Sequence, residues 1–290
     1  MKYNVILPTG ILAASLLFSG CGQQKNQDAD AASAKPAPPA AAETKTAPAA
    51  DFSASVEQYR TFAVEQCDLF VKETEKFTAA VKAGKLEEAK KLYAPARAYY
   101  ERIEPVAEAL GDLDPNIDAR VNDVDAADWR GFHRIEKALW EDKTTAGTEG
   151  FADQLLKDAQ LLRAKIETID LDASLMVTGA VELLNEVSSS KVTGEEELYS
   201  HTDLYDFAAN VEGAQKIYEI LKPELAKKDA ELEKEIETRF AALQKELNAF
   251  KKGDGYVDYT ALKQDEIRKL SQNLDALAEP LSNMGKILGV

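Results

Sequence analysis

Apolar residues recur at intervals of three and four through most of the chain after residue 52, which is the period of an α-helix with one buried face. The segment VEQYRTFAVEQCDLFVKETEKFTAAV shows the stripe most clearly, with Val56, Tyr59, Phe62, Ala63, Cys67, Phe70 and Val71 on one face. No segment alternates with period two over a useful length. The pattern therefore predicts an all-α domain in which Cys67 is a small buried hydrophobic residue.

The breaks in this pattern give the expected elements. We expect helices over 53–82, 86–110, 128–142, 149–168, 173–190, 203–226, 228–250 and 258–287. Pro95 and Pro105 fall within the second of these and should kink or interrupt it. Eight amphipathic helices with short links predict two packed four-helix bundles, with the boundary between them near 145–150.

The first 51 residues follow a different pattern. Lys2 precedes an apolar run that is too short to span a bilayer and that meets Cys21 directly after small residues. This arrangement resembles a lipoprotein signal, which implies a signal peptide over 1–20 and lipidation of Cys21; an ordinary secretory peptide is the alternative. Residues 21–51 are rich in Ala, Pro, Gln and Ser, so we expect a disordered tether ahead of a helical domain over 52–290.

Charge and cysteine content narrow the function classes. The chain has 51 acidic against 35 basic residues, a formal net charge of −16. Such a surface repels nucleic acid and attracts cations, although solubility outside the cell explains most of the charge without any ligand. With Cys21 lipidated, Cys67 has no disulfide partner. We therefore expect an extracytoplasmic protein that binds no nucleic acid.

The stretch GFHRIEKALW contains one of only two histidines in the chain. His133 and Glu136 are three residues apart, so a helix places them on one face with about 4.5 Å of rise between them. An imidazole and a carboxylate in this arrangement can hold one ion. The alternative is a structural hydrogen-bonded pair.

Two acidic stretches offer further ligands. In YYERIEPVAEALGDLDPNIDAR, Glu104 precedes Pro105, and Asp112, Asp114 and Asp118 crowd one turn. In VTGEEELYSHTDLYDF, Glu195, Glu196 and Glu197 precede His201. The alternatives are a helix cap for Asp114, a solvated first turn for the glutamates, and a buried hydrogen-bonded side chain for His201. One imidazole with several carboxylates suits iron, manganese or calcium, and Zn2+ and Cu2+ also bind such ligands.

Three long stretches in this order, IEPVAEALGDLDPNIDAR, GFHRIEKALW and GEEELYSHTDLYDFAANVEGA, resemble the imelysin-like domain of the EfeO/EfeM proteins of bacterial EfeUOB-type iron uptake. The resemblance implies a pair of four-helix bundles with a metal site in the cleft between them. It implies that His133, Glu136, Asp114 and Glu196 are metal ligands, with Glu104 and Glu197 as neighbours. Many EfeO proteins have a cupredoxin domain where this chain has a tether, so the resemblance does not support a second metal site or an electron-transfer step attributed to that domain.

The function that the resemblance implies is capture of iron, as Fe2+ or Fe3+, by a protein held to the cell membrane through a lipid anchor, in the periplasm or at the cell surface. The expected partners are an iron permease and a haem peroxidase of the same uptake system, and no enzymatic activity is expected. Two alternatives remain. The imelysin name belongs to a peptidase group, but the chain has no HExxH sequence, and two histidines cannot form a three-histidine zinc site. Binding of an anionic polysaccharide, reported for relatives of this domain, would need a bridging cation at so acidic a surface.

Overall fold

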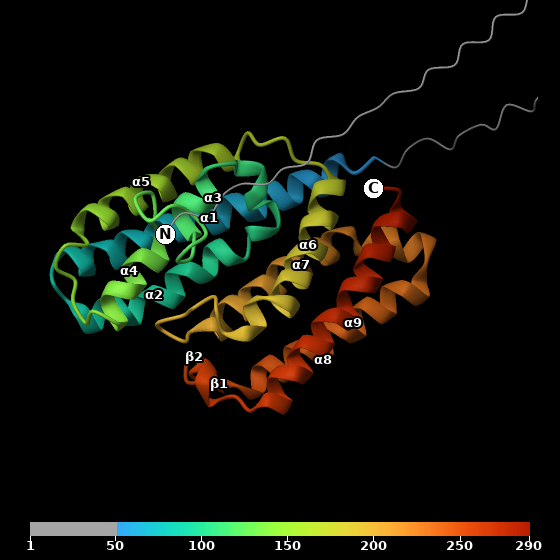
Figure 1. Cartoon of the computed structure of the whole chain (residues 1–290). Coiled ribbons are helices and arrows are strands. Elements are labelled where there is room, and N and C mark those ends of the chain that lie inside the picture. Colours follow the sequence, from blue (N-terminus) through green and yellow to red (C-terminus); the bar gives the residue numbers. More distant parts are fainter. Residues whose placement is uncertain (1–50) are drawn as a thin grey trace, which may run out of the picture. The chain divides into compact units, whose positions relative to one another are not determined.

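Helices make up most of the chain that the computed structural model describes, which is residues 51–290 apart from the side chains of 107 and 108 (Figure 1). The expected signal peptide, Cys21 and nearly all of the expected tether lie outside the described residues. The strands are a two-residue pair, β1 (Lys251–Lys252) and β2 (Gly255–Tyr256), which run antiparallel as a small hairpin. The expectation of an all-α fold is confirmed.

The longer helices form two groups. The first contains α1 (Ser53–Lys82), α2 (Leu86–Glu101), α4 (Phe132–Trp140) and α5 (Glu149–Ile166), with the short α3 (Leu113–Asp118) beside α5. The second contains α6 (Ala173–Ser189), α7 (Asp203–Lys228), α8 (Ala230–Ala249) and α9 (Gln264–Leu288). In Figure 1 the first group runs from blue to green and the second from yellow to red. The groups meet where α2 packs on α7 and where η1 (Glu104–Leu110) packs on α6.

The division between the two groups differs from the expected boundary. The helix that follows the turn at 145–150 is α5, and it packs along α1 in the first group. The chain passes to the second group only after α5, through residues 167–172. The turn at 145–150 does not mark the boundary between the groups, because a break between two helices does not show which helices each of them packs against.

The apolar stripe of α1 forms part of the core of the first group. Tyr59, Ala63, Cys67 and Phe70 are fully buried, and the helix has the bounds that the sequence predicts. Burial in this apolar core raises the pKa of the Cys67 thiol to about 12, as expected for a residue that acts as a small hydrophobe.

The connection between α2 and α4 departs most from expectation. The predicted helix 86–110 ends at Glu101, and the chain continues as the 3-10 helix η1, in which Pro105 is the second residue. Pro95, in contrast, lies within α2 without ending it. The α3 helix was not predicted, and α4 begins at Phe132 because Gly131 has a φ of 88°, outside the helical range. This irregular connection brings its polar side chains toward the second group of helices.

Within residues 51–290, no helix combines the length and apolar character needed to cross a bilayer.

Candidate metal site

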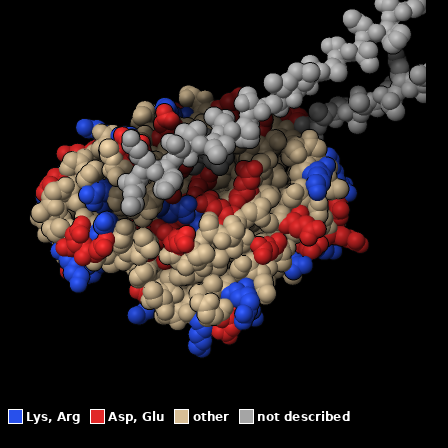
Figure 2. All heavy atoms as spheres, in the orientation of Figure 1, with Lys and Arg blue, Asp and Glu red and all other residues tan. Residues whose placement is uncertain are grey.

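An acidic cavity of about 620 Å³ lies where the two groups of helices meet. Its wall comes from η1, α3, the segment 119–131, α6 and the segment that precedes α7. The acids that line it are Glu104, Asp114, Asp118, Asp123, Glu182, Glu186 and Glu196. Among the lining residues, all of which belong to the described chain, Arg120 is the one base. Figure 2 shows acidic side chains gathered in a hollow in the middle of the face drawn.

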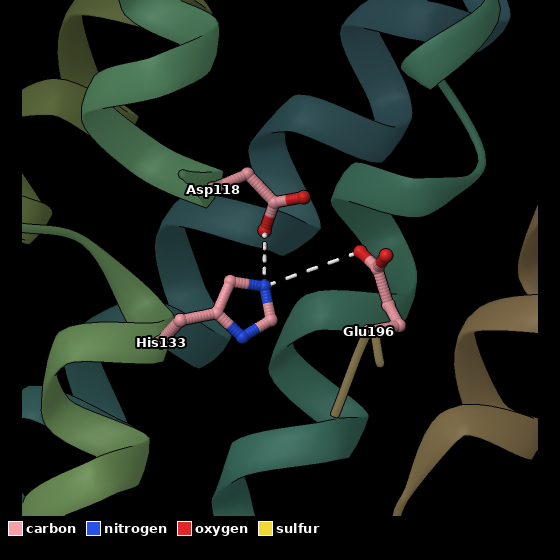
Figure 3. Close-up of side chains that lie close together, drawn as sticks. All are labelled: Asp118, His133 and Glu196. Carbon is pink, nitrogen blue, oxygen red and sulfur yellow. Dashed lines mark ion pairs between the residues drawn. The ribbon is translucent and has the colours of Figure 1, made fainter. Parts of the chain in front are cut away.

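His133 lies directly behind this wall and is 1% exposed. Its Nε2 atom lies 3.5 Å from Asp118 Oδ1 and 4.0 Å from Glu196 Oε1, as Figure 3 shows. Nε2 has no hydrogen-bond partner within the described chain, although it is fully buried. These three side chains come from α4, from the end of α3 and from the segment that precedes α7, and their ligand atoms are close enough together to share one ion.

The Nδ1 edge of the imidazole lies beside a second pair of acids, Glu136 and Glu197. Nδ1 lies 3.2 Å from Glu136 Oε2, and Glu197 completes a second group whose ligand atoms could share an ion. Glu136 is already engaged, because its Oε1 accepts hydrogen bonds from the backbone N–H groups of Tyr199 at 3.0 Å and Ser200 at 2.7 Å. Glu136 therefore fixes both the orientation of His133 and the course of the segment that precedes α7.

Two buried cations balance the acids. Arg97 of α2 is fully buried, donates to Glu101 Oε1 at 2.5 Å and to Asp118, and has its Nε 2.6 Å from Glu197 Oε1. The Lys191 ammonium, also buried, lies 2.9 Å from both carboxylate oxygens of Glu104. A fully buried acid is costly unless a cation or a hydrogen-bond donor compensates it, so these cations permit the cluster to exist.

The cluster shifts the pKa of most of its members. Burial and the charge of Arg97 lower the pKa of His133, but the carboxylates of Asp118 and Glu136 outweigh them and raise it to about 10. Burial would raise the pKa of Asp118, yet Arg97 and His133 hold it far below its usual range. Burial raises the pKa of Glu197 well above its usual range, and Glu136 adds to this effect. The cluster therefore holds protons that an incoming cation would displace.

The structure gathers most of the residues predicted from sequence. His133, Glu136, Glu196 and Glu197 lie together and are buried. Asp114 is half-buried, lines the cavity and accepts a hydrogen bond from Tyr100, but it belongs to neither group that could share an ion.

The remaining candidates lie farther from His133. Glu104 lines the cavity and pairs with Lys191, and it too lies outside both groups. Glu195 is exposed, and His201 lies in neither group. His201 has a left-handed backbone conformation, with a φ of 58°, at the turn before α7.

Three residues of the site were not predicted as members. Asp118 was noticed only as part of an acidic turn, although it lies four residues after Asp114. Arg97 interrupts an apolar face of α2 between Tyr93 and Tyr100, and a lone arginine at a core position is a signal for a buried ion pair. For Lys191 the sequence offers no comparable signal, because its partners are distant along the chain.

Comparisons with known proteins match this chain to one group. The family model described as imelysin, Peptidase_M75, matches residues 55–284. An "Efem/EfeO family lipoprotein" of Staphylococcus haemolyticus (strain JCSC1435) is 48% identical over 286 residues, which is 97% of this chain and 98% of that protein. A protein of the same description from Staphylococcus aureus (strain NCTC 8325 / PS 47) is 48% identical over 244 residues, covering 82% of this chain and 86% of its own length.

Proposed function

Because this chain belongs to the imelysin family, and because relatives similar over nearly its whole length are named Efem/EfeO family lipoproteins, we propose that it is an extracytoplasmic lipoprotein that captures iron and delivers it to a membrane permease. Iron is the cargo in this proposal, not a resident cofactor. The relatives' name supports association with an iron uptake system. The metal, the delivery step and the partners are our proposal.

The proposal rests on one observation above all, the position of the buried His133 Nε2 atom beside the carboxylates of Asp118 and Glu196. Its contacts with the two carboxylates, at 3.5 Å and 4.0 Å, are longer than an ordinary hydrogen bond. Here the atom faces two carboxylates, Asp118 and Glu196, at the wall of an acidic cavity. A metal ion between these three side chains would satisfy the nitrogen and neutralise the acids at once.

The remaining predicted residues then take different roles. We assign Glu136 to orienting His133, because ligating histidines commonly donate their other ring N–H to a carboxylate and Glu136 Oε2 lies 3.2 Å from Nδ1. Asp114 and Glu104 line the approach from the cavity and raise the local concentration of cations. Glu197 lies behind the imidazole and, through its ion pair, positions Arg97.

Anchoring and delivery complete the proposal. Lipidation of Cys21 would hold the domain at the membrane, and the segment up to residue 51 would give it reach. A permease would receive the iron, and a haem peroxidase of the same system would be the second partner. A purified permease should therefore be retained on immobilised protein, and an absence of retention in both metal-free and iron-bound forms would contradict direct delivery.

Titration calorimetry tests the binding step. Wild-type protein should bind Fe2+ under anaerobic conditions, and Mn2+ as a substitute that does not oxidise readily. His133→Gln and Glu196→Gln should each weaken binding by about a hundredfold or more, since loss even of an outer-shell residue commonly costs tenfold to a hundredfold. Glu182→Gln is the matched control, because Glu182 lines the same cavity but is exposed and lies in neither ligand group. Equal affinities in all four proteins would refute the site.

Peptidase activity is the competing assignment, since the matching family model includes that word in its name. A metallopeptidase needs a carboxylate free to act as a general base toward a metal-bound water. Glu136 has both oxygens engaged, one by two backbone N–H groups and the other by His133. We propose that the chain is not an enzyme, so protein incubated with Zn2+ or Fe2+ should leave an unstructured peptide intact. Cleavage that disappears in Glu136→Gln would reverse this assignment.

A further inference from the structure

The segment 119–131 reaches from α3 to α4 across one side of the cavity. It is held firmly at both ends. The Trp129 indole N–H donates to the backbone oxygen of Ala119 at 2.8 Å, and Gly131 packs so closely that a Cβ atom there would lie 2.3 Å from the Ile117 backbone oxygen. Between these anchor points, Arg120 and Asp123 face the cavity.

The Arg120 guanidinium occupies one side of the candidate site. Its Nη1 donates to Glu196 Oε2 at 2.8 Å, its Nη2 lies 3.8 Å from Glu186 Oε1, and its Nε donates to Asp123 Oδ2 at 3.2 Å. Glu196 is therefore shared, because its Oε1 faces His133 while its Oε2 is paired with Arg120.

Arg120 differs from the other arginine of the site in its freedom to move. Arg97 is fully buried and cannot withdraw without unfolding its surroundings, whereas the Arg120 side chain is 29% exposed at the cavity wall. If Arg120 released Glu196, it would still have Asp123 and Glu186 as partners, and both are far more exposed than Glu196. Release of Glu196 would therefore remove only part of the electrostatic stabilisation of the Arg120 guanidinium.

We propose that Arg120 is a resident counter-cation that an incoming multivalent ion must displace from Glu196, and that this exchange makes the site select ions by charge. The proposal rests on the proposed function and goes beyond it in naming the residue that determines specificity.

The physical reason for selectivity is the balance of charge in the exchange. A monovalent ion that replaces the guanidinium exchanges one unit of charge for another and gains little Coulomb energy. A divalent or trivalent ion brings two or three units of charge to the same carboxylates, so it gains more than Arg120 loses. Monovalent ions such as sodium and potassium would then not displace Arg120 from Glu196.

Calorimetry with Mn2+ on the full chain tests the proposal. Arg120→Gln should bind Mn2+ about tenfold more tightly than wild type, because the ion no longer competes with a guanidinium. Arg120→Lys retains the charge and should stay near the wild-type affinity. Arg102→Gln is the matched control, since Arg102 is 25% exposed and pairs with Glu212 away from the cavity, and its affinity should not change.

A second measurement separates competition from a general electrostatic effect. At constant ionic strength, replacement of tetramethylammonium chloride by sodium chloride should weaken Mn2+ binding to Arg120→Gln severalfold and leave the wild type unaffected. Circular dichroism should show that the variants keep their helical content.

Three outcomes would overturn the inference, and they are distinguishable. If the wild type binds Mn2+ through His133 but Arg120→Gln binds no more tightly, the inference fails while the proposed function stands. If the wild type does not bind Mn2+ or Fe2+ at all, the proposed function fails and the inference fails with it. Equal sensitivity of wild type and Arg120→Gln to sodium would also refute selection by Arg120.

Discussion

Carboxylates face both ring nitrogens of His133 and raise its pKa. Asp118 lies near Nε2 and Glu136 near Nδ1, and together they outweigh the effect of burial. A metal ion coordinates only an unprotonated imidazole nitrogen, so the ion and the proton compete for the same atom. The proposed site would therefore link metal capture to proton release.

This competition predicts the pH dependence of binding. Since the pKa of His133 is about 10, the residue is protonated throughout the neutral range and Mn2+ affinity should rise steadily between pH 6 and 8.5. Calorimetry in two buffers of different ionisation enthalpy should show release of at least about one proton per ion at pH 7. Binding that is independent of pH and of the buffer would contradict coordination by His133.

Arg97 forms ion pairs with five acids, more than any other cation of the site. Among the described residues it is the one cation in an ion pair with the buried Glu197 and Asp206, so its removal would leave these two acids without a counter-ion. Arg97→Met should lower the free energy of unfolding by about 3 to 5 kcal/mol. Arg163→Met is the control, because Arg163 is 25% exposed and its partners Asp68 and Glu167 are more exposed still, so the loss of each pair should cost less than about 1 kcal/mol. Urea unfolding measures both, and equal losses would show that the buried network does not stabilise the fold.

At the scale of elements, two glycines permit close backbone contacts between the two groups of helices. A Cβ atom on Gly179 of α6 would lie 1.7 Å from the Pro105 backbone oxygen, and one on Gly213 of α7 would lie 2.3 Å from that of Arg102. Both distances are far below van der Waals contact, so only glycine allows α6 and α7 to approach the end of α2 and η1 this closely. The two groups of helices therefore meet through backbone contacts at these positions.

Gly213→Ala should separate α7 from the end of α2 and lower the free energy of unfolding by about 1 to 3 kcal/mol. The matched control is Gly150→Ala in α5, where an added Cβ atom meets nothing within 4 Å. That control should instead stabilise the protein by roughly 0.5 to 1 kcal/mol, because alanine is the better helix former. Thermal unfolding of both variants measures these effects. An unchanged free energy of unfolding in Gly213→Ala would show that the contact between α7 and the end of α2 is not tightly packed.

Periodic elements were predictable, and irregular ones were not. The bounds of α1 follow directly from its apolar stripe, and the three-residue spacing placed His133 and Glu136 on one face of α4. The connection through η1 and α3 escaped prediction because its course depends on contacts with α6 and α7 that a local pattern does not contain. The same reason applies to Arg97 and Lys191, whose partners lie up to about a hundred residues away along the chain.

At the scale of the whole molecule, the proposal requires the domain to work while attached to a membrane. The attachment depends on Cys21, which lies outside the described residues. Cys21→Ser should therefore release the protein into the medium or block its processing. Detergent partitioning of cells that express either form gives the answer, and unchanged membrane association of the variant would refute the lipid anchor.

The central claim is that one ion is held at His133, on the cavity side of the imidazole. Anomalous diffraction from crystals of the protein bound to Mn2+ or iron tests it most directly. The account predicts a peak at coordination distance, about 2 to 2.3 Å, from His133 Nε2 and from carboxylate oxygens of Asp118 and Glu196. The same map should show Arg120 withdrawn from Glu196. A peak elsewhere in the protein, with His133 still between its carboxylates and no ion beside it, would contradict the account.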